Sequence, residues 1–181
     1  MRRILVSGLI NIETTLQVEG FPIDYEPVRF PFFGIQSSVS GVGYNVAKAL
    51  TVLGDDVRFL SLIGEDMAGR LVLESLADDG ISDVRVVTAL RQTPQSVILY
   101  DRTGRRAINT DLKDIQDAAY PADRFDEAIK GVGLAALCNI NFSRPFLARA
   151  HALGVPIATD VHTIADLEDP YNYDLGVFTV S

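Results

Sequence analysis

A short run of small residues followed by an asparagine is the segment best suited to bind a ligand. Residues 40–45 read SGVGYN and lead into the helical pattern of residues 45–53. Gly41 and Gly43 would let the backbone approach a ligand closely, and the first turn of a helix offers unpaired amide donors. The Asn45 amide adds donors and an acceptor suited to a pair of hydroxyl groups. A plain glycine turn, with Asn45 as a residue that starts the helix, explains the same pattern equally well.

Two carboxylates follow the ends of expected strands. Glu13 comes just after the apolar run of residues 3–10, at the sheet edge where α/β folds bind ligands. Ionised, it can accept hydrogen bonds from two vicinal hydroxyl groups, although an exposed loop carboxylate is more often simply solvated. Asp66 lies in residues 63–69 (IGEDMAG), between a strand and a helix. For Asp66 we favour a helix cap, with Gly64 forming the turn, over a ligand contact.

The elements that would hold these residues alternate between strand and helix. Apolar runs predict strands at residues 3–10, 57–63, 134–138, 155–160 and 175–180. Helical periodicity, with glycines after the helix ends, predicts helices at residues 45–53, 66–79, 122–130 and 143–153. The nearly continuous apolar character of the first run is typical of a strand buried on both faces of a parallel sheet. The sequence therefore predicts an α/β fold with a doubly wound, mostly parallel sheet flanked by helices.

Two stretches interrupt this alternation. Residues 12–35 combine β-branched and aromatic residues with three prolines, a composition that suits exposed strands and not a helix. Residues 95–110 contain two strand-like runs separated by a polar turn with Gly104, which predicts a hairpin. We expect the two stretches to build a small β-sheet over the edge of the main one.

Composition excludes several classes of function. The 181-residue chain has a net charge of −8 and no block rich in Lys or Arg, so nucleic acid and anionic membranes are not expected partners. With Cys138 as its single cysteine and no apolar run long enough to span a bilayer, the chain is expected to be cytoplasmic. Neither a P-loop motif nor the glycine fingerprint of nicotinamide-dependent oxidoreductases is present in the sequence.

Taken in order, these segments resemble the ribokinase-like (PfkB-type) carbohydrate kinases. The family opens with a strand, a glycine and an aspartate a few residues later, and here Gly8 and Glu13 occupy those places. Its Gly-Gly turn followed by Asn and Ala corresponds to residues 40–47 (SGVGYNVA), with serine for one glycine. Its V/I-G-x-D-x-x-G segment is matched in full by residues 63–69. The resemblance covers essentially the whole chain but only the N-terminal three-fifths or so of such a kinase.

The resemblance implies a division into two parts and a set of substrate contacts. Residues 1–11, 36–94 and 111–181 would form the α/β substrate-binding core, and residues 12–35 and 95–110 a β-sheet lid. Sugar hydroxyls would be bound by Glu13, Gly41, Gly43 and Asn45, the lid residues Ile98 and Ile108 would cover the sugar, and Asn139 or Asn141 would add a further contact. Glu13 is one methylene longer than the family's aspartate, which should shift the sugar or select a different one. Because the lids of two subunits pack together in many members, a homodimer through the lid is expected.

The resemblance also implies what this chain lacks. The family's magnesium-associated Asn-x-x-Glu segment and its later Gly-Ala-Gly-Asp turn, which holds the phosphoryl group and the catalytic base, have no counterpart in residues 1–181. ATP and Mg²⁺ are therefore expected for the complete enzyme, and neither a bound cofactor nor a catalytic residue is expected in this chain alone. The leading hypothesis is an ATP-dependent sugar kinase of which this chain is the sugar-binding half. The alternative is a non-catalytic module, derived from such a kinase, that binds a sugar or nucleoside.

Overall fold

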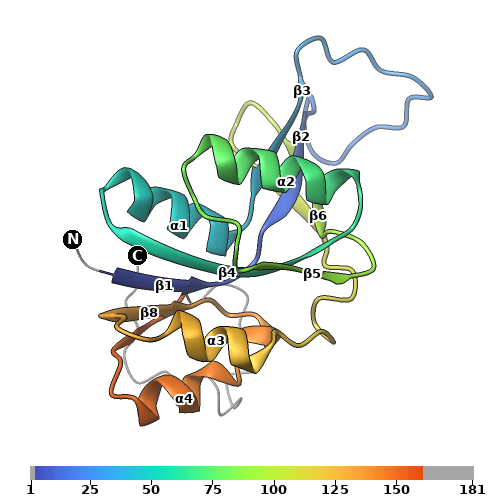
Figure 1. Ribbon diagram of the computed structural model, residues 1–181. Helices are drawn as coiled ribbons and strands as arrows, with labels where there is room; N and C mark the ends of the chain where they lie inside the picture. Colours follow the sequence, from blue (N-terminus) through green and yellow to red (C-terminus); the bar gives the residue numbers. More distant parts are fainter. Residues whose placement is uncertain (1–2, 161–181) are drawn as a thin grey trace, which may run out of the picture.

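The main body of the protein is a five-stranded parallel sheet between two layers of helices (Figure 1). The structure is a computed structural model that describes residues 3–160. The strands are β1 (Arg3–Ser7), β4 (Asp56–Gly64), β5 (Val86–Leu90), β8 (Leu134–Leu137) and β9 (Ile157–Ala158), in the order β5-β4-β1-β8-β9. This arrangement confirms the predicted α/β class.

Two helices cover each face of this sheet. α1 (Val42–Val52) and α2 (Met67–Asp78) lie on one face, and α3 (Ala122–Ala128) and α4 (Phe146–Ala152) lie on the other (Figure 1). Side chains of β1 alternate between them, since Ile4 and Val6 pack toward α1 and α2 while Leu5 packs toward α3 and α4. The strand therefore has no face exposed to water, which is why its sequence is continuously apolar.

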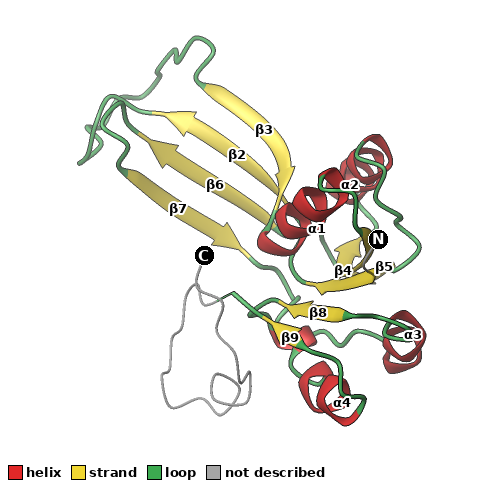
Figure 2. Cartoon of the chain, turned by 90° about the vertical axis from the view of Figure 1, so that its left-hand side faces the viewer, coloured by secondary structure: helices red, strands yellow, loops and turns green. Residues whose placement is uncertain are grey.

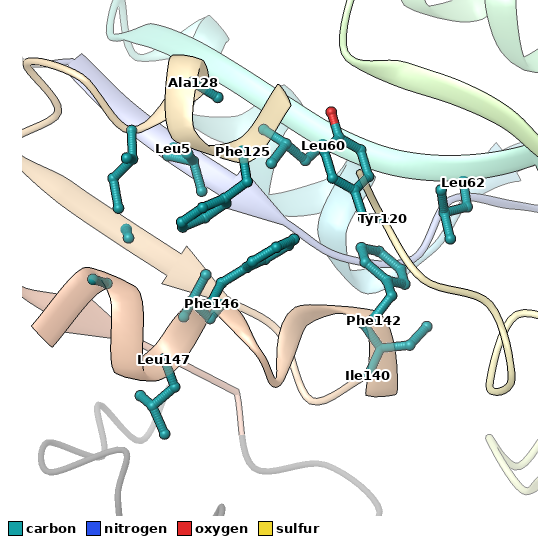
Figure 3. Close-up of a cluster of buried hydrophobic side chains, with 14 of the residues drawn as sticks. Leu5, Leu60, Leu62, Tyr120, Phe125, Ala128, Ile140, Phe142, Phe146 and Leu147 are labelled. Carbon is teal, nitrogen blue, oxygen red and sulfur yellow. The ribbon is translucent and has the colours of Figure 1, made fainter. Parts of the chain in front are cut away.

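Aromatic rings fill the core on the side of α3 and α4 (Figure 3). The rings of Phe125 and Phe146 stack with centroids 3.9 Å apart, and Tyr120 meets the edge of Phe146 at 5.8 Å. The Tyr120 hydroxyl donates a hydrogen bond to the Arg85 carbonyl oxygen (2.8 Å), so this polar atom is not left unpaired inside the core. The cluster joins the α3 and α4 layer to the sheet.

A second, four-stranded sheet projects from one end of the core (Figure 2). Its strands are β2 (Asn11–Gln17), β3 (Ile35–Ser40), β6 (Gln95–Tyr100) and β7 (Arg106–Asp111), in the order β3-β2-β6-β7. β2 pairs antiparallel with β3 and parallel with β6, and β6 pairs antiparallel with β7. Both interruptions of the helix–strand alternation therefore contribute to one sheet, as the sequence predicted.

The hairpin between β6 and β7 turns around a single buried carboxylate. Asp101 is 3% exposed, and its Oδ1 accepts hydrogen bonds from the Thr103 amide (2.9 Å) and hydroxyl (2.6 Å). Its Oδ2 accepts from Arg105 Nε (2.9 Å), and Gly104 takes the positive φ (88°) that closes the turn. The bonds from Thr103, together with those from Arg105, hold the pKa of Asp101 at about 2.

Three boundaries around the second sheet differ from the sequence prediction. Residues 36–40 belong to β3 in the second sheet and not to the core, because the chain leaves that sheet only at Gly41, whose φ is 108°. This glycine caps α1, so the helix begins at Val42, three residues earlier than predicted. Residues 18–34, in which the three prolines interrupt backbone pairing, form a loop and no strand.

The remaining differences lie nearer the end of the chain. The predicted helix at residues 143–153 is divided into a 3-10 turn, η1 (Asn141–Ser143), and α4, since Pro145 cannot donate a backbone hydrogen bond. β5 was not predicted, and β9 is shorter than the expected strand at residues 155–160. The strand predicted at residues 175–180 lies outside the described residues.

Replacement of Asp101 should weaken the hairpin in a pH-dependent way. Its folded-state pKa of about 2 lies below the unfolded value of 3.8, so the ionised carboxylate stabilises the fold above about pH 4 and loses this effect as the pH falls toward 2. Asp101→Asn should lower the melting temperature by several degrees at pH 7. The difference from the wild type should shrink below pH 4. Thermal melts followed by circular dichroism between pH 7 and pH 3 would measure it, and a pH-independent difference would contradict this origin.

Candidate functional site

One face of the second sheet carries three of the predicted substrate residues, Glu13, Ile98 and Ile108. Side chains alternate along a strand, so Asn11 and Glu13 share a face of β2. Asn11 lies opposite Ser40 of β3, and Glu13 lies between Ser38 of β3 and Ser96 of β6. This face therefore carries a band of carboxylate, amide and hydroxyl groups, all of which can hydrogen-bond to a hydroxylated ligand.

Two isoleucines border this polar band on the same face. Thr15 of β2 lies beside Ile98 of β6, and Ile98 lies opposite Ile108 of β7. The side chain of Ile98 is half-buried, and the apolar side chain of Ile108 is 53% exposed. The register thus brings the predicted lid residues Ile98 and Ile108 onto the face that carries Glu13. Ile98 lies on the strand next to that of Glu13, and Ile108 lies one strand further away.

Asn11 is a candidate site residue that the sequence reasoning missed. Its side chain is 3% exposed, and Nδ2 donates to Ser96 Oγ (2.8 Å), which donates to Thr110 Oγ1 (3.2 Å). Among the described residues no donor reaches the buried Oδ1 of Asn11. A buried acceptor without a partner is costly, and a ligand hydroxyl would satisfy it. Its signal in the sequence is an amide that directly follows the apolar run of residues 3–10.

The two motif glycines occupy different environments. Gly41 precedes α1 with a positive φ, and a Cβ atom there would lie 2.6 Å from the Leu9 carbonyl oxygen. Gly43 lies buried within the first turn of α1, where a Cβ atom would lie 2.5 Å from the carbonyl carbon of Gly8. Gly8 in turn has no room for a Cβ atom, which would come 2.6 Å from Cys138 Sγ. Close approach of backbone to backbone is thus sufficient reason for glycine at 8 and 43.

The asparagines predicted to contact the substrate, Asn45 and either Asn139 or Asn141, lie at the same end of the core as this sheet. Asn45 is exposed on α1, and its Nδ2 donates to Ser40 Oγ (3.4 Å), next to the position of Asn11. Asn139 lies two residues after the end of β8, and its backbone amide donates to Asp160 Oδ1 (3.0 Å). Asn141, the alternative to Asn139, donates from Nδ2 to the Gln116 carbonyl oxygen (3.0 Å).

The segment at residues 63–69 caps a helix, as we had favoured. Asp66 Oδ1 accepts from the Gly69 amide (2.7 Å) at the start of α2, and Asp66 also accepts hydrogen bonds from Thr93. Partial burial acts to raise the pKa of Asp66, but the hydrogen bonds from Thr93 and Gly69 outweigh it and hold the pKa below its ordinary value. Asp66 is therefore ionised near neutral pH and serves the fold, with no direct contact to the polar band required.

Other chemistries find little support in the described residues. Burial, followed by the nearby Asp160 carboxylate, raises the pKa of the Cys138 thiol well above its usual range, so it is not an activated nucleophile. Within residues 3–160, no group of three or more His, Cys, Asp or Glu side chains could hold a metal ion. No helix in the described part of the chain is long and apolar enough to cross a membrane.

Comparison with known proteins identifies the family. Residues 1–140 match the pfkB family of carbohydrate kinases. The chain belongs to the PfkB family. Among curated proteins, this PfkB chain is 28% identical over 109 residues to a bifunctional ribokinase/ribose-5-phosphate isomerase A from Fructilactobacillus sanfranciscensis, covering 60% of the chain and 20% of the relative. It is also 44% identical over 48 residues to the uncharacterized sugar kinase YeiI of Escherichia coli, covering 26% of the chain and 13% of the relative.

Solved structures show the same fold. The microbiome-derived acarbose kinase Mak1 superposes with a TM-score of 0.82 at 24% identity, covering 96% of this PfkB chain and 57% of that chain. A putative ribokinase from Agrobacterium tumefaciens gives 0.75 at 21% identity, covering 88% and 52%. A nucleoside kinase from Burkholderia thailandensis in complex with inosine gives 0.67 at 19% identity, covering 88% and 51%. The ribokinase-like fold is thereby confirmed, and the chain spans about half the length of these structures.

The tight contact between Gly43 and Gly8 can be tested by a single added methyl group. Because a Cβ atom at residue 43 would meet the backbone of Gly8, Gly43→Ala should destabilise the fold by about 1–3 kcal/mol, despite the better helix propensity of alanine. Denaturant unfolding would measure the change. Gly20→Ala is the control, since Gly20 has no positive φ and an added Cβ there would approach only the end of the Arg105 side chain, at 3.8 Å. A Gly43→Ala variant as stable as the wild type would show that the contact is looser than described.

Proposed function

We propose that the complete protein transfers a phosphoryl group from ATP to a hydroxyl group of a sugar or of a nucleoside's sugar. This chain would supply the sugar-binding part and a β-sheet lid made of the second sheet. The observation that carries the proposal is the buried, unpaired Asn11 Oδ1 beside the Glu13 carboxylate, on a sheet face that also presents Ile98 and Ile108. Membership of a family of carbohydrate kinases supports the same chemistry.

In this proposal the polar band orients the accepting hydroxyl group. The Glu13 carboxylate accepts hydrogen bonds from two sugar hydroxyls, and Asn11 Oδ1 accepts a third that would replace its missing partner. Asn45 contributes an exposed amide from α1, and Gly41 allows the ligand to approach its backbone. Phosphoryl transfer depends on such positioning, since a small displacement of the acceptor lowers the rate steeply.

Ile98 and Ile108 would allow the lid to exclude water from the bound sugar. Apolar side chains above the sugar exclude water, which would otherwise compete with the sugar as the phosphoryl acceptor. Ile108 is half exposed, so it has apolar surface to bury when a sugar binds. We assign no general base and no phosphate contact to the described residues.

The hydrogen-bonding groups of the polar band indicate a substrate that carries several hydroxyl groups on a ring. The solved structures that share the fold include an acarbose kinase and nucleoside kinases, one of them with inosine bound. A sugar or a nucleoside is therefore the substrate proposed for this protein. ATP with Mg²⁺ would be the phosphoryl donor of the complete enzyme.

Removing the charge of Glu13 tests the proposed substrate site. Glu13→Gln keeps the length of the side chain but replaces one acceptor oxygen by a donor, so sugar affinity should fall about tenfold or more. The measurement is calorimetric titration of a panel of D-ribose, D-fructose, maltose and inosine, with ATP-dependent phosphorylation of the same panel by the full-length protein. Glu74→Gln, the same change on the exposed surface of α2, is the control.

The outcomes of this test separate the two functional hypotheses. Phosphorylation of one panel member, weakened by Glu13→Gln and unaffected by Glu74→Gln, supports the kinase. Tight binding of a sugar or nucleoside with no ATP-dependent turnover by the full-length protein would instead favour the non-catalytic module. An equal loss of sugar affinity in Glu13→Gln and Glu74→Gln would show that Glu13 does not bind the sugar.

We also propose that two copies associate through their lids. The loop at residues 18–34 presents four aromatic side chains to solvent, Tyr25, Phe30, Phe32 and Phe33, of which Phe33 is 99% exposed. The Phe30 and Phe32 rings stack on each other with their centroids 6.4 Å apart. Both rings line an open groove of about 920 Å³ between the loop and the ends of β2 and β3. Apolar surface of this extent is typical of an interface and is unusual on a monomer.

Loss of these aromatic side chains should dissociate the proposed dimer. Phe32→Ser with Phe33→Ser should shift the mass measured by sedimentation equilibrium from two copies toward one, because the buried apolar area is lost. Val52→Ser with Leu53→Ser removes similarly exposed apolar side chains at the end of α1 and should leave the mass unchanged. A wild-type chain that stays monomeric at tens of micromolar would rule out this association.

A further inference from the structure

The carboxylate of Asp66 has more partners than a helix cap needs. Besides the Gly69 amide at the start of α2, its Oδ2 accepts from the Thr93 amide (2.9 Å) and its Oδ1 from the Thr93 hydroxyl (2.7 Å). Thr93 is completely buried and lies 27 residues further along the chain. Its Oγ1 also accepts a hydrogen bond from the Gly64 amide (3.0 Å). One side chain of the core therefore binds the segment that leads from β5 into β6.

The glycines of the same motif shape this contact. A Cβ atom at Gly64 would lie 2.7 Å from the carbonyl carbon of Gln92 and from the Thr93 amide nitrogen. A Cβ atom at Gly69 would lie 2.2 Å from the Gly64 carbonyl oxygen and 3.1 Å from Thr93 Oγ1. Glycine is thus needed at both positions for the crossing segment to lie against the start of α2, a requirement that a helix cap alone does not impose.

The segment held by Asp66 is continuous with the polar band. The next residue, Pro94, accepts a hydrogen bond at its carbonyl oxygen from the Ile12 amide (3.2 Å). Two residues later, Ser96 accepts from Asn11 Nδ2 (2.8 Å) and donates to Thr110 (3.2 Å). The hydroxyl that orients the Asn11 amide therefore lies three residues from the point where the core binds the chain.

We propose that Asp66 and Thr93 act as a clamp that sets the register of β6 beside β2 and so orients Asn11 for substrate binding. The inference rests on the proposed function, because it assigns the clamp a role in binding at the same site. Asp66 and Thr93 are positioning residues, since both act through Ser96 and Asn11 and neither contacts the ligand. Without the clamp, the segment at residues 91–94 would shift, and the Asn11 amide would lose its fixed donor–acceptor partner.

The experiment compares graded variants of the clamp with a matched control. Thr93→Val removes the hydroxyl at nearly constant volume, Thr93→Ser keeps it, and Asp66→Asn keeps one acceptor oxygen. The control is Asp79→Asn at the other end of α2, where the carboxylate accepts from the Tyr44 hydroxyl and pairs with Lys48 (2.9 Å). It therefore loses comparable hydrogen bonds at the end of α2 opposite to Asp66.

The first measurement does not depend on any ligand. In ¹⁵N-labelled chain, Thr93→Val and Asp66→Asn should shift the Asn11 side-chain amide resonances and accelerate hydrogen exchange of the Ile12 amide by about tenfold. Thr93→Ser should restore both toward wild type, and Asp79→Asn should leave both unchanged even where it lowers the melting temperature. Unmoved Asn11 resonances in Thr93→Val, or an equal shift in Asp79→Asn, would overturn the clamp.

The second measurement connects the clamp to binding. For whichever of D-ribose, D-fructose, maltose or inosine binds the wild-type protein, Thr93→Val should weaken binding about tenfold and Thr93→Ser much less. Unchanged affinity in Thr93→Val would overturn the positioning role even if the resonances shift. If no panel member binds the wild type, the proposed function fails, and the resonance and exchange data alone decide whether the clamp exists.

Discussion

The close approach of Gly8 and Gly43 is the contact on which the arrangement of the two sheets depends. With no side chain on either residue, the first turn of α1 lies directly on the chain that leaves β1, and the Tyr44 amide donates to the Leu9 carbonyl oxygen (3.2 Å). This contact decides the direction in which β2 departs from the core. A side chain at either position would separate helix and strand, and would move Asn11 and Asn45 apart.

The second sheet is therefore held firmly where it meets the core and is open at its far end. At its base, the crossing before β2 lies against α1, and the crossing before β6 lies against the start of α2. Small residues and buried hydrogen bonds dominate there. At the far end, the loop at residues 18–34 is rich in exposed aromatic side chains. The candidate binding face lies at the rigid end, which suits a site that must hold donors and acceptors in fixed positions.

How well the sequence predicted each element depended on whether its signal is local. The strand of β1 and the helices α2 and α3 have strong periodicity with glycine or proline at their ends, and were predicted to within a few residues. The hairpin of β6 and β7 was predicted from its turn chemistry around Gly104. β5 escaped because five residues of mixed burial give little periodicity. The break at Pro145 and the true start of α1 depend on backbone geometry that composition alone does not reveal.

Whether a residue of the candidate site could be predicted also depended on whether its signal is local. Glu13 was named from its place after the first apolar run, and Ile98 and Ile108 from the resemblance. The strand register brings the three to one face. Asn11 could not be recognised, because its importance arises from burial and from Ser96, a partner distant in the chain. Thr93 was missed for the same reason. Gly43 was predicted to contact a ligand, a role that stays a prediction, while its packing against Gly8 requires three-dimensional information.

The strand order of the second sheet has a consequence for how the protein folds. Its two central strands, β2 and β6, pair in parallel. Five elements lie between them in the chain, namely β3, α1, β4, α2 and β5. Their pairing closes a long loop, and such non-local contacts form slowly because their entropic cost precedes their stabilisation. The core must bring residues 12 and 95 together before the sheet can form. Until then the hairpin of β2 and β3 lacks the neighbour on which its stability depends, so a nascent chain exposes an unpaired strand edge until β6 has been synthesised.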